Sequence, residues 1–359
     1  MNLLYLTADV VGLESGGGIV TKNEAEALAE LGECEVWDRK VLEQVKDSGD
    51  EPWKWDRAAL RKLWELDPDV PIELVHGYAG TFTESIHHLK KRGAKVCWTV
   101  AAHDLEESIA EHVKMFGNYP FAHMSDPVQF ERYKRGYLEA DMLVCPSSYS
   151  ADIMRRYGRT GPIAVIPHGV HLPEKVEPLP KRFVCGYLGA MGVDKGLLYL
   201  LQAWKKLNYK DALLLIAGKQ STEPQVVEFI KQNGGGNIQV CGWVNNVSDF
   251  YNRLSVYVQP SVSEGFGIEI LEAMAHGRPV ICSEGAGATE LIYSDYSYAP
   301  GFCFLPRDVD SLAMQIDEYK KHPDMAEEDG ADGRKIAEQN TWQIIRERYK
   351  ELWKGMLND

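Results

Sequence analysis

The sequence has no paired cysteines. Its seven cysteines stand alone, without a Cys-x-x-Cys pair, and most of them lie inside apolar runs such as residues 96–98 and 280–282. Isolated cysteines in apolar segments are typical of reduced thiols packed in a core, whereas a disulfide framework needs pairs. We therefore expect a cytoplasmic protein.

Long apolar runs are also missing. No stretch approaches the roughly 20 residues that a membrane-spanning helix needs. The chain opens directly on an apolar segment at residues 3–6, without the basic region and cleavage site of a secretory leader. We expect neither secretion by that route nor a transmembrane segment, and peripheral contact with a membrane stays open.

Positive charge is scarce. Acidic residues outnumber basic ones by 53 to 39, which gives a formal net charge of −14, and the acidic excess extends over both halves of the chain. Proteins that bind nucleic acid need lysine and arginine to neutralise phosphates. The charge therefore disfavours nucleic acid as a partner.

Metal-binding patterns are absent as well. The only Asp-x-Asp triplet, Asp67-Pro68-Asp69, contains a proline and precedes an expected strand, which is typical of a turn. No convincing cluster of metal-ligating residues accompanies it. We expect a protein that needs no metal.

What the sequence does contain is a regular alternation of short apolar runs and amphipathic segments, which predicts β-α units and parallel sheets. The alternation breaks at 173–180, where three prolines and several charges replace the apolar pattern. This indicates two doubly wound α/β domains, residues 1–172 and 181–340, joined by that linker. Residues 341–359 are expected to form a closing helix that joins the first domain.

Ligands are expected at the carboxyl ends of the strands in both domains. The predicted strands are 2–8, 33–37, 72–76, 95–100, 141–146, 162–167, 183–188, 212–217, 237–241, 255–259, 278–282 and 302–305. The predicted helices are 19–31, 82–92, 128–139, 148–157, 196–207, 223–233, 267–276 and 309–321.

A run of three glycines follows the first strand. Gly17 and Gly18 lie just before the helix expected from Ile19. Glycine lets bare backbone approach a ligand at a helix N-terminus, so a phosphate or a transferred sugar fits there. A flexible turn explains the glycines equally well.

A second glycine loop, after the strand 255–259, gives a sharper signal. The helix that follows it starts near Gly267, so the backbone N–H groups of the loop point outward at the positive helix end and can hold a diphosphate. These N–H groups belong to Gly265, Phe266, Gly267 and Ile268. Glu264 and Glu272 can border the same pocket, where carboxylates beside a diphosphate are expected to bind sugar hydroxyls. From spacing alone, they also fit a loop residue and a surface helix residue.

The run 260–281 resembles the E-x7-E signature of the retaining GT-B glycosyltransferases, the large family numbered four. The resemblance covers nearly the whole chain, with its motifs in the family's order. The other matching segments are 16–18, 98–104, 140–147, 165–170, 189–196 and 238–244. It implies two Rossmann-like domains facing each other across a cleft, and transfer of a sugar with retention of configuration. The implied donor is a UDP- or GDP-sugar, used without a metal, and the implied acceptor group is a hydroxyl.

The resemblance also implies roles for individual residues. Glu264 would lie at the hydroxyls of the transferred sugar and Glu272 at the ribose. Lys195 would contact the diphosphate. His103 would lie near the reacting centre, at the carboxyl end of a strand. His76 carries a weaker signal and is interpreted as a strand cap.

Two further positions match donor-binding segments of the family. Gly189 begins the segment that resembles the phosphate loop, and Val244 lies in the turn that resembles the one beside the donor base. The chain departs from the pattern at Ala190, where the family has arginine, and at His168, where it has asparagine. The missing cation puts donor affinity and rate in doubt, and we considered Arg278 or Lys219 as substitutes.

The departures leave two alternatives to a fully active enzyme of this kind. One is a nucleotide-sugar-binding partner subunit with weak or no turnover. The other is a glycosyltransferase whose acceptor is a nucleobase or nucleic acid. The acceptor, whether a saccharide, a lipid or another hydroxyl compound, is not identified, because the N-terminal loops that should shape its site, such as 53–55 and 104–127, match nothing specific.

Overall fold

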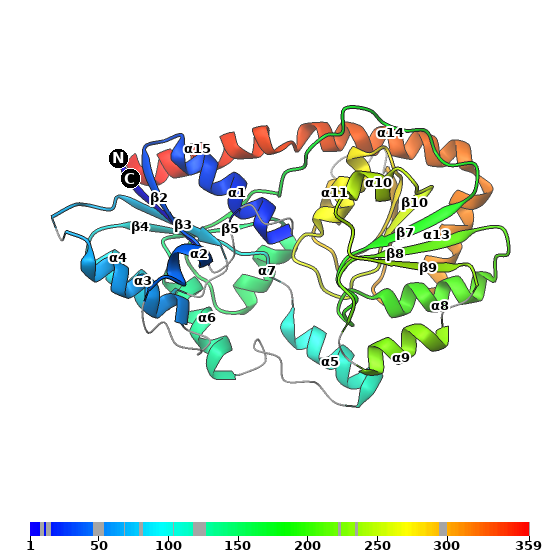
Figure 1. Ribbon diagram of the computed structural model, residues 1–359, viewed down its shortest axis with the longest axis horizontal. Helices are drawn as coiled ribbons and strands as arrows, with labels where there is room; N and C mark the ends of the chain where they lie inside the picture. Colours follow the sequence, from blue (N-terminus) through cyan, green and yellow to red (C-terminus); the bar gives the residue numbers. More distant parts are fainter. Residues whose placement is uncertain are drawn as a thin grey trace. The chain divides into compact units, whose positions relative to one another are not determined.

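The protein divides into two compact units. Unit 1 comprises Met1–Ala102, Pro120–His168 and Trp342–Asp359, and unit 2 comprises His103–Tyr119 and Gly169–Thr341. The computed structural model describes residues 1–7, 11, 16–45, 54–67, 69–78, 82–102, 104–117, 127–221, 224–233, 236–293 and 300–358. Each unit has one six-stranded parallel sheet with helices on both faces, so the prediction of two doubly wound domains is confirmed (Figure 1).

The sheet of unit 1 has the strand order β2-β1-β3-β4-β5-β6. Its strands are β1 (Asn2–Thr7), β2 (Glu33–Trp37), β3 (Leu74–Tyr78), β4 (Lys95–Thr99), β5 (Met142–Cys145) and β6 (Ile163–Val165). In register, Leu4 of β1 lies between Glu35 of β2 and Val75 of β3. The order reverses between β1 and β3, which is the point where doubly wound sheets bind ligands.

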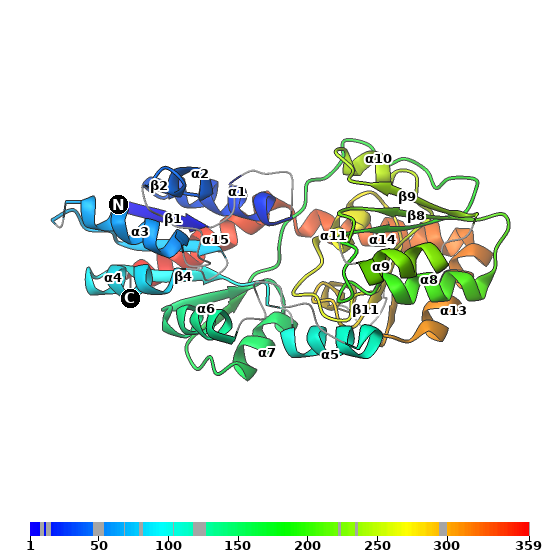
Figure 2. The same cartoon turned by 60° about the horizontal axis from the view of Figure 1, so that its bottom comes forward.

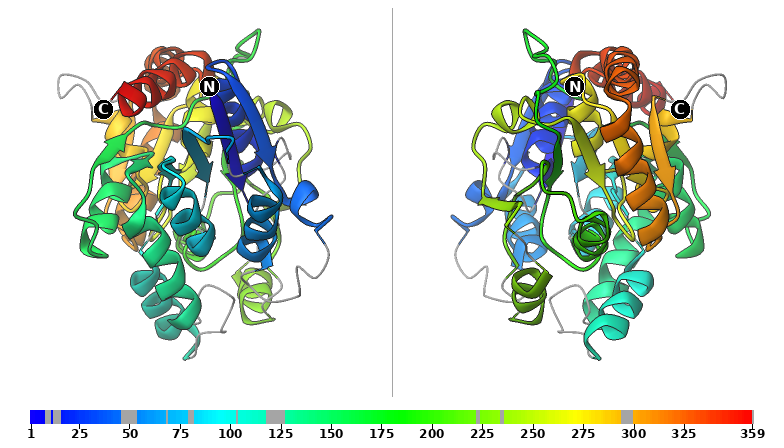
Figure 3. Two further views of the ribbon diagram at one scale, coloured as in Figure 1. Left: turned by 90° about the vertical axis from the view of Figure 1, so that its left-hand side faces the viewer. Right: turned by 90° about the vertical axis from the view of Figure 1, so that its right-hand side faces the viewer.

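Alternate residues of these strands face two different layers of helices. One face packs on α2 (Arg39–Leu42), α3 (Lys54–Glu65), α4 (Thr83–Lys91), α6 (Pro127–Glu139) and α7 (Ser148–Arg156), with Trp98 fully buried in the core between them. The other face carries α1 (Gly16–Ala29) and α15 (Trp342–Asn358), which lie side by side (Figure 3). Arg346 of α15 donates to the Asn23 side chain of α1 at 2.7 Å, which ties the closing helix to the first one.

A buried polar network lies under α1 and α15. The Glu24 carboxylate accepts hydrogen bonds from Tyr5 at 2.7 Å and from Tyr349 at 2.8 Å, and it lies 3.3 Å from His76 Nε2. Burial raises the pKa of Glu24, whereas His76 and the hydrogen bonds from Thr99 and Tyr5 lower it. The lowering effects together are larger, so the pKa of Glu24 lies below its ordinary value. His76 is therefore part of the buried polar network of unit 1, within β3.

The sheet of unit 2 has the strand order β12-β11-β10-β7-β8-β9. Its strands are β7 (Val184–Leu188), β8 (Leu213–Ala217), β9 (Ile238–Gly242), β10 (Val256–Gln259), β11 (Val280–Ser283) and β12 (Gly301–Phe304). This is the Rossmann order, and it reverses between β7 and β10. A ligand of unit 2 is therefore expected where those two strands end.

Two sets of helices cover this sheet (Figure 2). One set, α10 (Val247–Tyr251), α11 (Ile268–Ala275), α12 (Thr289–Ile292) and α14 (Pro323–Gln339), packs on one face. The other set, α8 (Leu197–Leu207), α9 (Pro224–Asn233) and α13 (Val309–Lys321), packs on the opposite face. No helix in the described ranges is long and apolar enough to cross a membrane.

The helix α5 (Leu105–Phe116) belongs to unit 2, although we assigned its residues to the N-terminal domain. Arg307 explains the difference, because its guanidinium contacts the carboxylates of Glu107 at 2.8 Å and Glu111 at 2.5 Å. Glu111 is buried and also accepts a hydrogen bond from Tyr199 of α8. These contacts fix α5 on the α8 face of the second sheet.

Candidate active site

Two loops meet at the switch point of unit 2. The first runs from the end of β7 to α8, and the second from the end of β10 to α11. A Cβ on Gly196, which caps α8 with a φ of 68°, would lie 1.9 Å from the Pro260 carbonyl oxygen, so only glycine allows this approach. The Val262 N–H donates to the Asp194 carbonyl at 2.7 Å. The two loops therefore form one rigid structure at the place where the topology predicts a ligand.

The two loops also share an ion pair. The Lys195 ammonium contacts the Glu264 carboxylate, and both side chains stay partly exposed, 26% and 17%, so a ligand can reach them. Burial lowers the pKa of Lys195, but the carboxylates of Glu264, Asp194 and Glu269 overcome this effect and hold it above its ordinary value. Lys195 thus carries a positive charge that a diphosphate could share.

The N-terminus of α11 opens beside this pair. Its cap residue, Gly267, has a φ of 89° and provides no side-chain acceptor for the N–H groups of the first turn. Two backbone hydrogen bonds join the loop before α11 to residues 285–288. The Glu264 N–H donates to the Gly285 carbonyl at 2.8 Å, and the Ala288 N–H donates to the Phe266 carbonyl at 2.8 Å. The helix end with its partial positive charge is thus preorganised to receive an anion.

Glu272 lies one turn into α11 and is held by neighbouring side chains. The buried Tyr251 hydroxyl donates to Glu272 Oε2 at 2.8 Å, and its ring stacks on His276 at 5.0 Å. His276 in turn contacts the Glu272 carbonyl and the Ser248 hydroxyl. Burial and the nearby Glu269 raise the pKa of Glu272 to about 7, while the Tyr251 hydrogen bond opposes this rise.

A third carboxylate in this group, Glu269, was not predicted from the sequence. It lies in the first turn of α11, three residues before Glu272, so both side chains are on the same face of the helix. Burial and Glu264 raise the pKa of Glu269 to about 7, against the opposing effect of Lys195. The helical spacing of Glu269 and Glu272 was the signal that could have identified it.

The remaining predicted residues of unit 2 border the same edge of the sheet. Gly189 follows β7, and its carbonyl oxygen lies 2.0 Å from where a Cβ on Gly218 would stand, so these two backbones touch. Val244 follows β9 and is half-buried. His103 lies outside the described residues, but its neighbour Asp104 caps α5 and donates its N–H to the Ser263 hydroxyl at 2.6 Å.

In unit 1, Gly17 and Gly18 form the first turn of α1, which begins at Gly16 rather than near Ile19. The Thr21 hydroxyl donates to the Gly18 carbonyl at 3.1 Å. The glycines thus lie at a helix N-terminus beside the switch point between β1 and β3.

Of the two basic residues considered as substitutes for the missing arginine, Arg278 lies away from the site and Lys219 lies near it. Ala190 is exposed at the start of the loop, and its carbonyl accepts the Tyr187 hydroxyl at 2.7 Å. Arg278 is fully buried at the amino end of β11 and donates to the carbonyls of Leu254 and Glu177, so it cannot face the site. Lys219 follows β8, and its carbonyl accepts the Met191 N–H of the loop, which places it nearby with an exposed side chain.

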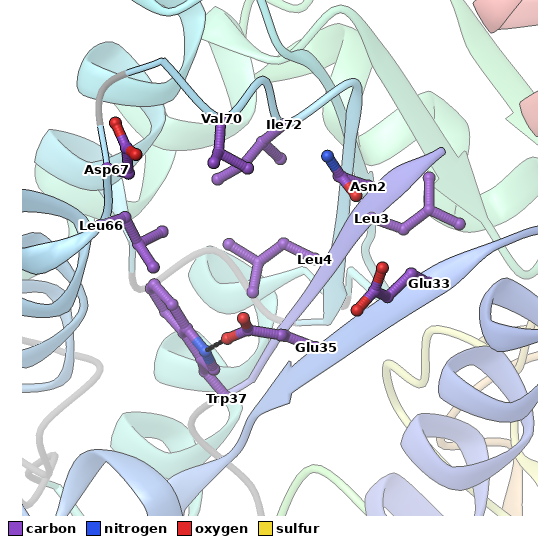
Figure 4. A pocket seen from close by; sticks show the side chains of 10 residues that line it. All are labelled: Asn2, Leu3, Leu4, Glu33, Glu35, Trp37, Leu66, Asp67, Val70 and Ile72. Atoms are coloured by element: carbon purple, nitrogen blue, oxygen red, sulfur yellow. Dashed lines mark hydrogen bonds between the residues drawn. The ribbon is translucent and has the colours of Figure 1, made fainter.

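A cavity of about 340 Å³ lies elsewhere, along the amino half of β1 and the edge strand β2 (Figure 4). Its apolar wall includes Leu4 and Ile72, and the carboxylates of Glu33, Glu35 and Asp67 line its rim. Glu35 accepts a hydrogen bond from the Trp37 indole at 2.8 Å. No lysine or arginine stands among the described residues that line this cavity to offset the three carboxylates, so it does not suit a diphosphate.

The fold is the GT-B fold, and glycosyltransferases are among its structural neighbours. Sucrose-phosphate synthase from Thermosynechococcus elongatus has the same fold, with a TM-score of 0.80, 18% identity and 99% of each chain covered. The pneumococcal O-GlcNAc transferase GtfA, solved with UDP and GlcNAc, has a TM-score of 0.61 and 18% identity over 84% of this chain and 60% of its own. The predicted GT-B fold is confirmed.

The family follows from the sequence matches. Residues 15–173 match Glycosyltransferase Family 4 and residues 182–321 match Glycosyl transferases group 1. The chain belongs to the group 1 glycosyltransferases of family 4. It is also 31% identical over 188 residues to the capsular polysaccharide biosynthesis glycosyltransferase CapM of Staphylococcus aureus, an alignment that covers 50% of this chain and 48% of CapM. The chain thus spans about half the length of this relative.

Proposed function

We propose that the chain is a retaining glycosyltransferase that moves a sugar from a UDP- or GDP-sugar to an acceptor hydroxyl without a metal. The observation that carries the proposal is the Lys195–Glu264 pair beside the open N-terminus of α11, in a chain of this family. This arrangement brings together a fixed cation, helix N–H groups and a carboxylate that can accept hydrogen bonds from sugar hydroxyls.

The chemistry assigns a role to each part. Breaking the anomeric bond develops negative charge on the leaving diphosphate and positive charge on the sugar. Lys195 and the N–H groups at Gly265–Ile268 stabilise the leaving diphosphate, because they are already oriented before the reaction. Glu264 accepts hydrogen bonds from the sugar hydroxyls, and Glu272 accepts them from the ribose.

Retention places the attacking hydroxyl on the face that the diphosphate leaves, where the diphosphate can take its proton. This mechanism and the roles of His103, Gly17 and Gly18 at the sugar rest on the family resemblance alone. The name of CapM associates that relative with capsular polysaccharide, which supports a saccharide acceptor for this chain.

The test of this function is a thermal-shift screen of nucleotide sugars, followed by donor hydrolysis without acceptor, in excess chelator. We expect at least one donor to raise the melting temperature and to be hydrolysed slowly, because the proposed site holds the diphosphate with protein groups only. Binding without hydrolysis would instead indicate the nucleotide-sugar-binding subunit. Activity that returns only with magnesium or manganese would contradict metal independence.

The two carboxylates of the signature should separate binding from turnover. Glu264→Gln should lower single-turnover rates by about 10²-fold with donor affinity changed less than about threefold, because a bond to the sugar strengthens in the transition state. Glu272→Gln should weaken donor affinity about tenfold and leave the rate nearly unchanged. Calorimetry and single-turnover kinetics measure both quantities, and each variant is the control for the other. The opposite pattern would exchange the two roles.

A further inference from the structure

Arg307 lies in the turn between β12 and α13, outside the segments assigned to the donor. We propose that Arg307 is a positioning residue for the reaction, which holds the loop of Glu264 in its reactive geometry by fixing α5. The inference rests on the proposed function, since it concerns the same site, and it adds a residue to which the donor chemistry gives no role.

The backbone of Arg307 has a conformation that is unusual for its residue type. Its φ is 74°, in the left-handed region that favours glycine and asparagine. The turn around it is tight, because the Asp308 N–H donates to the Leu305 carbonyl at 3.1 Å and Asp308 then caps α13. An arginine here costs free energy that a glycine would avoid. Such residues persist where their surroundings hold them in place, and they cluster at functional sites.

The Arg307 side chain is held by two carboxylates of α5. Its guanidinium donates to Glu107 at 2.8 Å and to Glu111 at 2.5 Å. The Glu111 side chain is only 1% exposed, and its other oxygen accepts a hydrogen bond from the Tyr199 hydroxyl of α8. A buried carboxylate between a guanidinium and a hydroxyl is a fixed contact, unlike an exposed surface pair. Arg307 therefore fixes the first two turns of α5 on unit 2.

A series of hydrogen bonds leads from this contact to the proposed site. The Glu107 N–H donates at 3.1 Å to the side chain of Asp104, which is the N-cap of α5. The Asp104 N–H donates in turn to the Ser263 hydroxyl at 2.6 Å. Ser263 is fully buried and directly precedes Glu264, whose carboxylate pairs with Lys195. The position of α5 thus bears on the loop that carries Glu264.

Three successive residues of this loop are each held by a different part of the chain. The Val262 N–H donates to the Asp194 carbonyl at 2.7 Å, and the Glu264 N–H donates to the Gly285 carbonyl at 2.8 Å. Between them, Ser263 makes the contact with α5. Displacing α5 leaves the first two contacts in place, so we expect the loop to keep its fold while Glu264 loses its fixed orientation. A misplacement of about 1 Å that originates far from the chemistry can cost about 10²-fold in rate.

The diphosphate of the donor is bound by other groups in the proposed site. These are Lys195 of the β7–α8 loop and the N-terminus of α11, and the contacts described above between α5 and the site go through Ser263 instead. Loss of the Arg307 contact should therefore lower the rate and leave donor affinity nearly unchanged. A residue that only stabilised the fold would not separate these two quantities.

The experiment measures donor hydrolysis by the full chain without acceptor, with the nucleotide sugar that raises the melting temperature most. Arg307→Asn removes the guanidinium and keeps a residue that tolerates the positive φ. We expect its single-turnover rate to fall about tenfold and its donor dissociation constant to change less than about twofold. Arg307→Lys keeps the charge and should restore the rate to within about threefold of the wild type. The control, Lys321→Ala, breaks an exposed ion pair with Asp317 on α13 and should change neither quantity.

A double-mutant cycle tests whether the effect passes through α5. Ser263→Ala removes the acceptor of the Asp104 N–H and should lower the rate about as much as Arg307→Asn. The double variant should be no slower than the slower single variant, because both changes break the same series of contacts. Glu107→Gln leaves the Arg307–Glu111 pair intact and should lower the rate about threefold, which keeps the test decisive if Arg307→Asn does not fold.

Three results would each overturn this inference while the proposed function stands. They are an unchanged rate in Arg307→Asn or in Glu107→Gln, rate losses that multiply in the double variant, and a loss of donor affinity without a loss of rate. A wild-type chain that neither binds nor hydrolyses any nucleotide sugar, or that binds one without hydrolysis, would overturn the proposed function and the inference with it.

Discussion

Lys195→Ala should lower kcat/KM for the donor by about 10³-fold. The structure pairs the Lys195 ammonium with Glu264 in the loop before α11, and Ala190 leaves no neighbouring arginine to share the diphosphate charge. Removing one preorganised group that stabilises a developing anion costs about 10²–10³ in rate. The bound donor also loses its attraction to the Lys195 charge, so donor affinity should fall as well. Both kcat and KM should therefore change.

Single-turnover kinetics and donor titrations separate these two effects. Lys206→Ala is the matched control, because Lys206 lies on α8 and forms an exposed ion pair with Asp310. Its removal should change neither constant by more than about twofold, as expected for a surface pair. If Lys195→Ala and Glu264→Gln both behave like the wild type, the site assignment is wrong.

Glu24→Ala should destabilise unit 1 by about 3–5 kcal/mol. Glu24 is buried, accepts hydrogen bonds from Tyr5 and Tyr349, and lies against His76. Its removal leaves buried polar groups without their acceptor and opens a space beneath α1 and α15, and breaking a buried pair in this way costs several kcal/mol. The Glu26→Ala control removes a carboxylate of the same helix that is 43% exposed, and should cost less than about 1 kcal/mol.

A chain with two units need not unfold in a single transition, so a global unfolding measurement does not show which unit is destabilised. Hydrogen exchange of the amides of β1 and β3 measures the effect in unit 1 directly. We expect faster exchange there in Glu24→Ala and wild-type exchange in β7 and β8. Equal stability of the two variants would mean that the network contributes nothing beyond its packing.

The sheets were predictable because their strands are short apolar runs with sharp ends, and all twelve lie where the alternation placed them. Three long helices were missed for separate physical reasons. In α14, Gly330 and Gly333 resemble helix breakers, but a Cβ on Gly330 would lie 2.3 Å from the Gly277 carbonyl oxygen, so the glycines serve close packing on α11. In α3, Trp55 was interpreted as part of an acceptor loop, yet it is buried in the core. The helix α5 was taken as part of a loop region that matched nothing specific.

The site was predictable only in part. Topology indicates that the loops after β7 and β10 meet, and the resemblance named Lys195 and Glu264, but no spacing along the chain shows that two residues so far apart form an ion pair. Glu269 was missed because the family signature directs attention to its two terminal glutamates. Its half-buried position in the first turn of α11 is a property of three-dimensional packing, not of the motif.

The position of α15 has a consequence for the order in which the protein is made. This helix covers one face of the first sheet, yet the ribosome synthesises it after the whole of 169–341. The core of unit 1 therefore stays open on the side of Tyr5 and His76 until α15 emerges, while all of unit 2 is available earlier. Translation thus favours completion of the second domain before the first.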